Sequence, residues 1–131
     1  MHQYAFINPK LLTHIENYSE EKVLRLSKKI TSEGLWTRPI CVCNKSFLIM
    51  DGQHRRQVGL RLELSIVPCV LLDYKSVKIH SLHKDIEVNL DKIYSNYFNK
   101  VIYPYKTVKH YFEDSIFENY KTVSIDHLKF I

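Results

Sequence analysis

A short stretch near the middle of the chain carries residue types that bind phosphate. Directly after an apolar run come Asp51, Gly52, Gln53, His54 and Arg55. The first N–H groups of a helix are unpaired and carry partial positive charge, so a helix beginning here makes an anion site. Gly52 lets the backbone approach a ligand, Arg55 offers a guanidinium fork, and His54 can donate to phosphate or shuttle a proton. The sequence therefore predicts phosphate binding at this turn.

Asp51 admits two interpretations. At the end of a strand, its carboxylate could hold Mg²⁺ between phosphate oxygens or orient a nucleophile. Strand–Asp–Gly–helix turns are also common without any ligand. The alternative is that Asp51 only caps the helix while Arg55 and Arg56 are solvated.

The spacing of apolar residues predicts the elements that position the turn. A hairpin is expected around Asn44-Lys45, and its second strand ends on Asp51. Ser19 is a good N-cap, with Glu20 and Glu21 in the first helical turn, and Gly34 is a good stop. The first half is expected to hold strands at 4–7 (an edge strand), 39–42, 47–50 and 66–72, and helices at 19–33 and 53–63.

The second half has weaker signals. A strand is expected at 77–82, and helical spacing of apolar residues predicts helices at 84–98 and 106–117, with a break at Tyr103-Pro104. A short strand, or a strand and turn, is expected at 122–131. His80 and His83 have H-x-x-H spacing, but without a third ligand nearby we interpret them as structural or exposed.

Composition limits the class of protein. The chain has 131 residues, 45% of them hydrophobic and 25% charged, which is typical of one globular domain. A net charge of +5 favours an anionic partner, and free nucleotides, nucleic acid and phosphorylated metabolites satisfy it equally well. Cys41, Cys43 and Cys69 are an odd number in apolar runs, so we expect reduced, buried thiols and no zinc site. No signal peptide or membrane helix is recognisable, which predicts a cytoplasmic protein without a membrane partner.

From Gly34 to Tyr74 the sequence resembles the ParB/sulfiredoxin superfamily. The resemblance lies in Gly-Leu-Trp-Thr-Arg-Pro-Ile at 34–40, Met-Asp-Gly-Gln-His-Arg-Arg at 50–56, and Val-Pro-Cys-Val-Leu-Leu-Asp-Tyr at 67–74. It implies a single α+β domain over residues 1–131, with a small mixed sheet flanked by helices and a phosphate-binding turn before a helix.

Two branches of the superfamily fit poorly. Sulfiredoxin carries a reactive cysteine in its turn, where this chain has Gln53, and none of its three cysteines replaces that nucleophile. Partition proteins of the ParB type read G-E-R-R and continue into a helix-turn-helix domain. Here Gln53-His54 replaces the Glu-Arg pattern, and too little chain is expected to remain for such a domain.

The free-serine kinases, which include an archaeal ADP-dependent enzyme and a staphylococcal siderophore-pathway relative, fit better. Their turn reads D-G-H-x-R, and this chain matches it at Asp51, Gly52 and Arg55. They also carry a late motif, P-P-K-[ST]-T-R-H. The chain matches this motif at Pro104, Lys106, Thr107 and His110 and departs from it at Tyr105, Val108 and Lys109.

The resemblance implies a kinase that transfers phosphate from ATP or ADP to the hydroxyl of a free amino acid, serine or a close analogue. Glu16, in an L-x-x-H-E-like segment, would be the general base, with Glu20 and Glu21 as fallbacks. Asp51 would position the hydroxyl or Mg²⁺. The alternative for Glu16 is a surface residue before a helix.

The remaining roles follow from the same resemblance. Gly52, Gln53, His54 and Arg55 would hold the nucleotide phosphates; Lys106, Thr107 and His110 would hold the acceptor. Trp36 could form a wall of the pocket, or equally be core. The departures at Val108 and Lys109 leave the acceptor open, since they remove a hydroxyl donor and a bidentate fork. The alternative function is a ParB-like nucleotide- and DNA-binding regulatory protein without kinase activity.

Overall fold

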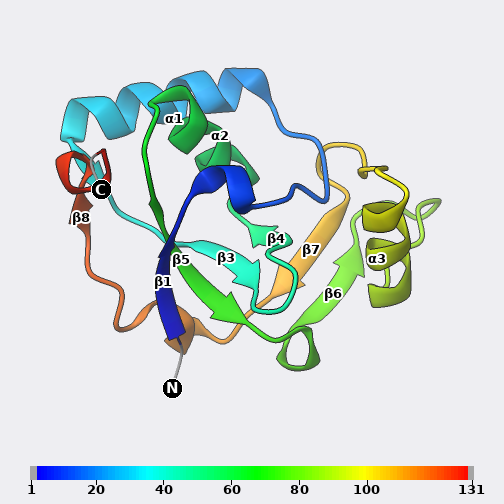
Figure 1. Ribbon diagram of the computed structural model, residues 1–131. Helices are drawn as coiled ribbons and strands as arrows, with labels where there is room; N and C mark the ends of the chain where they lie inside the picture. Colours follow the sequence, from blue (N-terminus) through cyan, green and yellow to red (C-terminus); the bar gives the residue numbers. More distant parts are fainter. Residues whose placement is uncertain (1–2, 130–131) are drawn as a thin grey trace.

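A four-stranded mixed sheet organises the computed structural model, which describes residues 3–129 (Figure 1). Its order is β1 (Gln3–Ile7), β5 (Val67–Leu72), β3 (Ile40–Cys43) and β4 (Ile49–Asp51). β5 pairs antiparallel with β1 and parallel with β3, and β3 pairs antiparallel with β4. The predicted α+β fold with a small mixed sheet is therefore confirmed, and β1 is an edge strand as expected.

The two helices of the first half lie together at one end of the sheet, at the top of Figure 1. α1 (Glu20–Glu33) begins where the Ser19 hydroxyl accepts the Lys22 N–H, and it ends at Gly34, whose φ is +68°. α2 (Gln53–Arg61) follows β4 directly. Both helices match the predicted spans within two residues, because their start and stop signals are local in sequence.

The sheet separates two hydrophobic clusters. On β3, Ile40 and Val42 pack into the cluster under α1 and α2, while Cys41 and Cys43 point into the other cluster. This alternation is the two-residue period of a strand buried on both faces. The second cluster is covered by α3 (Leu90–Phe98) and by a separate two-stranded ribbon. The three cysteines are free and buried, as the sequence predicts.

The ribbon corrects the expectation of a helix over 106–117. β7 (Val108–Tyr111) pairs antiparallel with β6 (Lys78–Ser81), and only a short 3₁₀ turn (Asp114–Phe117) follows it. Burial alternates along β7: Val108 and His110 are buried, whereas Lys109 and Tyr111 are exposed. That period of two, together with the left-handed backbone of Lys106 (φ 58°), excludes a helix.

Several other elements differ from the prediction in their bounds. α3 begins at Leu90 rather than at 84, because the Asn89 side chain accepts the Lys92 N–H and so caps the helix there. A strand that was not expected, β2 (Leu35–Trp36), pairs with β8 (Val123–Ser124). The predicted strand and turn at 122–131 is β8 followed by a 3₁₀ turn (Ile125–Leu128), and residues 130–131 lie outside the described part.

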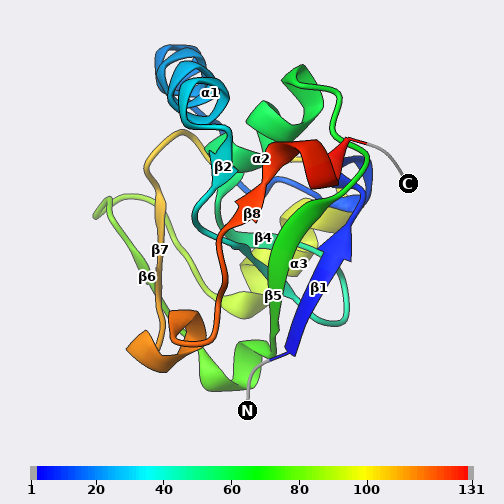
Figure 2. The same cartoon turned by 90° about the vertical axis from the view of Figure 1, so that its left-hand side faces the viewer.

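Figure 2 shows the β6–β7 ribbon on the side of the molecule away from β1. No helix within residues 3–129 is long and apolar enough to cross a membrane.

The packing of α2 against the sheet depends on Gly59. A Cβ atom there would lie 2.9 Å from Cγ1 of Val67 on β5, a side chain that is fully buried and stiff about χ1. We expect Gly59→Ala to lower the free energy of unfolding by about 1–2 kcal/mol, since overpacking outweighs the gain in helix propensity. Urea denaturation measures this, with the exposed helical substitution Lys28→Ala as control. Unchanged or higher stability of Gly59→Ala would contradict this packing.

Candidate functional site

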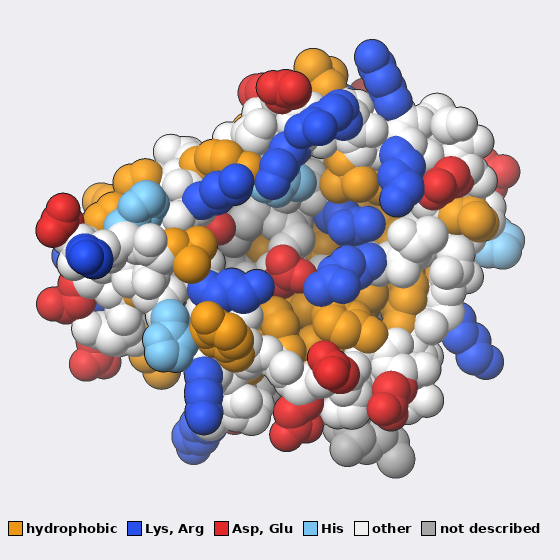
Figure 3. All heavy atoms as spheres, turned by 180° about the vertical axis from the view of Figure 1, so that it is seen from behind, with side chains coloured by type: hydrophobic (Ala, Val, Ile, Leu, Met, Phe, Trp, Pro, Cys, Tyr) orange, Lys and Arg blue, Asp and Glu red, His pale blue; other side chains and the backbone are white. Residues whose placement is uncertain are grey.

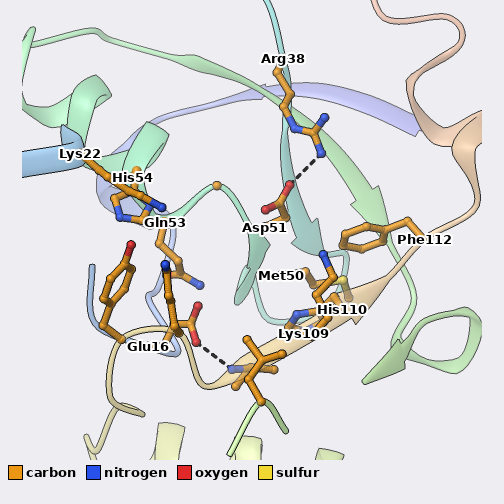
Figure 4. Close-up of a pocket in the computed structure, with 15 residues that line it drawn as sticks. Glu16, Lys22, Arg38, Met50, Asp51, Gln53, His54, Lys109, His110 and Phe112 are labelled. Atoms are coloured by element: carbon orange, nitrogen blue, oxygen red, sulfur yellow. Dashed lines mark hydrogen bonds and ion pairs between the residues drawn. The ribbon is translucent and has the colours of Figure 1, made fainter. Parts of the chain in front are cut away.

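A cleft of about 380 Å³ opens between the start of α2 and the β6–β7 ribbon. Figure 4 shows Lys22 and His54 on one side, Lys109, His110 and Phe112 on the other, and Glu16 and Asp51 between them. The complete lining is Glu16, Lys22, Arg38, Met50, Asp51, Gly52, Gln53, His54, Leu82, Tyr105, Lys106, Val108, Lys109, His110 and Phe112. The structure thus brings the early glutamate, the central turn and the late motif together.

The start of α2 is open. Gly52 occupies the N-cap position with φ 113°, and no side chain caps the helix. The alternative that Asp51 caps α2 is therefore wrong. A Cβ atom on Gly52 would come within 3.0 Å of Ile40 Cγ2, so both the backbone angle and the packing require glycine. The uncapped N–H groups at the edge of the cleft are available to an anion.

Asp51 is paired across the cleft edge instead. One carboxylate oxygen, Oδ2, accepts from the Arg38 guanidinium at 3.0 Å, and both side chains are slightly under half exposed. The same guanidinium lies 4.1 Å from the ring centre of Phe117. An ion pair this exposed contributes at most about 1 kcal/mol to stability, so it serves chiefly to orient the two groups.

Glu16 joins two distant parts of the chain. Its Oε2 accepts the backbone N–H groups of Thr107 at 3.1 Å and Val108 at 2.9 Å. The strand-like bridge between Glu16 and Tyr103 holds the two segments side by side. Burial raises the pKa of the Glu16 carboxyl; the two N–H groups oppose that shift and Asp51 adds to it. Both hydrogen bonds use Oε2, which leaves Oε1 available as an acceptor.

Two histidines of the cleft are held neutral. His54 Nε2 accepts the Ser19 N–H at 3.0 Å, which places the ring proton on Nδ1, and burial and Lys22 lower its pKa. His110 is hydrogen-bonded through Nε2 to the Tyr74 hydroxyl at 3.1 Å, and burial lowers its pKa to about 4. At neutral pH neither ring adds a positive charge to the cleft.

Four of the predicted site residues have side chains directed elsewhere. Trp36 is fully buried in the core, and Thr107 is fully buried with its hydroxyl donating to the Pro104 carbonyl. Gln53 reaches the cleft lining, but its amide donates to the Ile49 carbonyl. Arg55 does not line the cleft, and its side chain borders a neighbouring groove on α1.

Several cleft residues carry no signal of their own in the sequence. Lys22, Arg38, Met50, Leu82 and Phe112 come from five different parts of the chain, and only the fold brings them together. Lys22 belongs to the first turn of α1 and Arg38 to the segment before β3, where each reads as an ordinary surface cation. The fallback bases Glu20 and Glu21 are absent from the lining, and Glu20 pairs with Arg61 at 3.0 Å.

The side chains that line the cleft have a net positive charge. Four cations, Lys22, Arg38, Lys106 and Lys109, share the lining with two carboxylates. Figure 3 shows Lys and Arg side chains gathered around a hollow that contains acidic side chains. Such a surface attracts an anionic ligand, while the carboxylates supply a base or a metal ligand.

No family model matches the sequence, and no curated protein matches it. Several solved structures, in contrast, match this chain. SbnI with a C-terminal truncation, from Staphylococcus aureus, superposes with a TM-score of 0.75 at 9% identity, covering 85% of this chain and 83% of that one. A free serine kinase in complex with AMP gives 0.57 at 21% identity, covering 74% of this chain and 43% of that one.

A conserved hypothetical protein from Pyrococcus furiosus gives a TM-score of 0.56 at 25% identity, covering 60% of this chain and 37% of that one. This chain therefore matches less than half the length of the kinase and of the Pyrococcus protein. The chain shares its fold with SbnI and with free serine kinases.

Proposed function

We propose that this chain is a small-molecule kinase that transfers a phosphoryl group from ATP or ADP to the hydroxyl of free serine, or of a close analogue such as threonine. The product is O-phosphoserine or its counterpart. One observation carries the proposal: Glu16 and the open start of α2, which lie far apart in sequence, line the same cationic cleft. Structural neighbours named as free serine kinases were solved with ADP or AMP, which supports a nucleotide as donor.

Glu16 is the general base in this proposal. Its Oε1 takes the proton of the acceptor hydroxyl as the hydroxyl oxygen forms a bond to the terminal phosphorus. The bond from that phosphorus to the bridging oxygen breaks, and the nucleotide leaves with the electron pair. A raised pKa makes the Glu16 carboxylate a stronger base than a free glutamate, while the Thr107 and Val108 N–H groups hold it in position.

The donor phosphates bind at the start of α2. The uncapped N–H groups after Gly52 point along the helix axis toward the cleft edge, and Lys22 and His54 lie beside them. The proton of neutral His54 is on Nδ1, so this ring can donate one hydrogen bond to a phosphate oxygen. Preorganised donors of this kind stabilise the charge of a transferring phosphoryl group.

The acceptor binds at the ribbon side. Lys106 and Lys109 provide charge for its carboxylate, and neutral His110 provides a polar wall. The departure from the late motif at Val108 costs less than the sequence suggested, because Glu16 contacts the backbone N–H of Val108 and not its side chain. Lys109 keeps a positive charge but not a bidentate fork.

Mg²⁺ is compatible with the cleft. This ion is usually held by one or two carboxylates plus substrate phosphates. Among residues 3–129 there is no group of three or more side chains that would form a complete protein site. Asp51 lines the cleft with one carboxylate oxygen engaged by Arg38, so it fits as the protein ligand of an ion that arrives with the nucleotide. When bound, such an ion neutralises phosphate charge.

A nucleotide and amino-acid screen tests the function directly. The chain is incubated with Mg²⁺, ATP or ADP, and each of the free hydroxyl amino acids, and the phosphoamino acid is detected by mass spectrometry. We expect O-phosphoserine or O-phosphothreonine. If no phosphoamino acid forms with either nucleotide, while the chain binds CTP or shows salt-sensitive DNA binding, the ParB-like regulatory function replaces the kinase.

Two substitutions of Glu16 separate catalysis from folding. Glu16→Gln retains a carbonyl oxygen for the Thr107 and Val108 N–H groups, so we expect near wild-type stability with kcat lower by about 10²–10⁴. Glu16→Ala leaves both N–H groups unpaired and should also lower the free energy of unfolding by about 1–3 kcal/mol. Turnover assays and thermal melts measure both effects. Glu21→Gln is the matched control, and full turnover by Glu16→Gln would refute the assignment.

The pH profile gives a second test of Glu16. Because burial raises its pKa, the base becomes protonated at a higher pH than a free glutamate would. We expect kcat/KM to fall as the pH is lowered through this raised pKa, and the acid limb to disappear from the residual activity of Glu16→Gln. An acid limb at or below the ordinary glutamate pKa, or one that persists in the variant, would assign the titration to another group.

Asp51→Asn tests the metal and positioning role. Its ion pair with Arg38 is half exposed, so we expect stability to change by less than about 1 kcal/mol. Turnover should fall at least tenfold, and the Mg²⁺ concentration for half-maximal rate should rise. Steady-state rates at varied Mg²⁺ measure this, with the exposed Asp91→Asn as control. An unchanged Mg²⁺ dependence in Asp51→Asn would remove Asp51 as the metal ligand.

A further inference from the structure

A second hollow adjoins the cleft. This α1–α2 groove has a volume of about 340 Å³ and is lined by Lys22, Arg25, Leu26, Lys29, His54 and Arg55. Lys22 and His54 also line the cleft, so the two hollows share a wall and lie next to each other. The groove lining contains four cations and no carboxylate.

The cations follow one face of α1. Lys22, Arg25 and Lys29 are three and four residues apart, so their side chains project on the same side over two turns. The 1.5 Å rise per residue separates Lys22 from Lys29 by about 10 Å along the axis. A row of this length exceeds the size of one phosphate, and it suits a chain of several phosphates.

The positive charge in the groove is poorly compensated. The Arg55 side chain is more than half buried; burial and the nearby Arg38 both lower its pKa, and Asp51 opposes them. Arg55 Nε is buried and has no hydrogen-bond partner within residues 3–129. Two carboxylates of the neighbouring elements are paired with other cations: Glu20 with Arg61 and Asp51 with Arg38. An anion in the groove would supply the missing counter-charge.

We propose that the α1–α2 groove binds the phosphates of a linear polyphosphate ligand that lie beyond the phosphate held at the start of α2. On the proposed kinase function, on which this role rests, these are the phosphates that stay on the donor after transfer. The length of the cation row then selects a donor with three or more phosphates, a nucleoside triphosphate or inorganic polyphosphate, over a diphosphate. Leu26 is the only apolar residue of the lining, so the groove offers little apolar surface to a ligand.

Binding of inorganic tripolyphosphate and pyrophosphate, measured by titration calorimetry on the intact chain, tests the groove. We expect tripolyphosphate to bind more tightly, and the double variant Arg25→Ala/Lys29→Ala to weaken it by about tenfold per cation removed. Pyrophosphate, held nearer the start of α2, should change less than threefold. Lys28→Ala is the control, because Lys28 is an exposed cation of the same helix that does not line the groove.

Three results would overturn the proposal. The first is unchanged tripolyphosphate affinity in the double variant. The second is an equal loss in Lys28→Ala, which would indicate only diffuse charge attraction. The third is a single-stranded oligonucleotide that binds more tightly than tripolyphosphate and loses affinity in the double variant, which would make the groove a nucleic-acid surface. These outcomes are independent of turnover: groove binding without phosphoamino-acid formation supports the groove and removes the kinase.

Discussion

The cleft depends on one partly buried carboxylate that accepts two backbone N–H groups. Glu16 Oε2 is bonded to Thr107 and Val108, residues more than ninety positions away in sequence. Removing a carboxylate from water is costly, and burial accordingly raises its pKa. The two N–H groups offset part of that cost and fix the start of β7 beside the segment that precedes α1. The same contact therefore forms one wall of the cleft and keeps a base of raised pKa there.

The opposite wall of the cleft, at the start of α2, is formed at a cost in helix stability. A helix start is usually stabilised by a capping side chain, which contributes about 1 kcal/mol. α2 has none: Gly52 occupies the N-cap position, and the carboxylate before it, Asp51, pairs with Arg38. The helix forgoes this stabilisation, and its N–H groups remain accessible. Packing of Gly52 against Ile40 holds the turn in place without a cap.

The correct and the wrong predictions from the sequence are both explained by the range over which each signal acts. Signals that act within a few residues were read correctly, such as the Ser19 cap of α1 and the apolar run of β5. The prediction of a helix at 106–117 is wrong. The apolar residues there fit both the helical period of 3.6 residues and the strand period of two, and pairing with β6 makes the segment a strand. Lys22 and Arg38 are not predicted as site residues, because Lys22 lies in an ordinary helix start and the 34–40 segment assigns no role to Arg38. Their place in the cleft comes from the tertiary arrangement of α1 and of the segment before β3, which no local pattern encodes.

The departures from the late kinase motif gain meaning from where they lie. Tyr105, Val108 and Lys109 all line the cleft, and none is a surface position far from the site. Tyr105 lies 5.6 Å from Lys22 Nζ and 5.5 Å from Lys106 Nζ, so its ring occupies the space between two cations and makes cation–π contact with both. A chain that had lost function would be expected to accumulate changes at random, including at Glu16 and Gly52. On the proposed function, Glu16 and Gly52, which serve proton transfer and phosphate binding, are present; apart from Gln53 in the turn, the departures lie on the wall where we propose that the acceptor binds. That distribution favours altered acceptor selection over loss of the phosphate chemistry, because a few side chains on one wall are enough to change which hydroxyl compound fits.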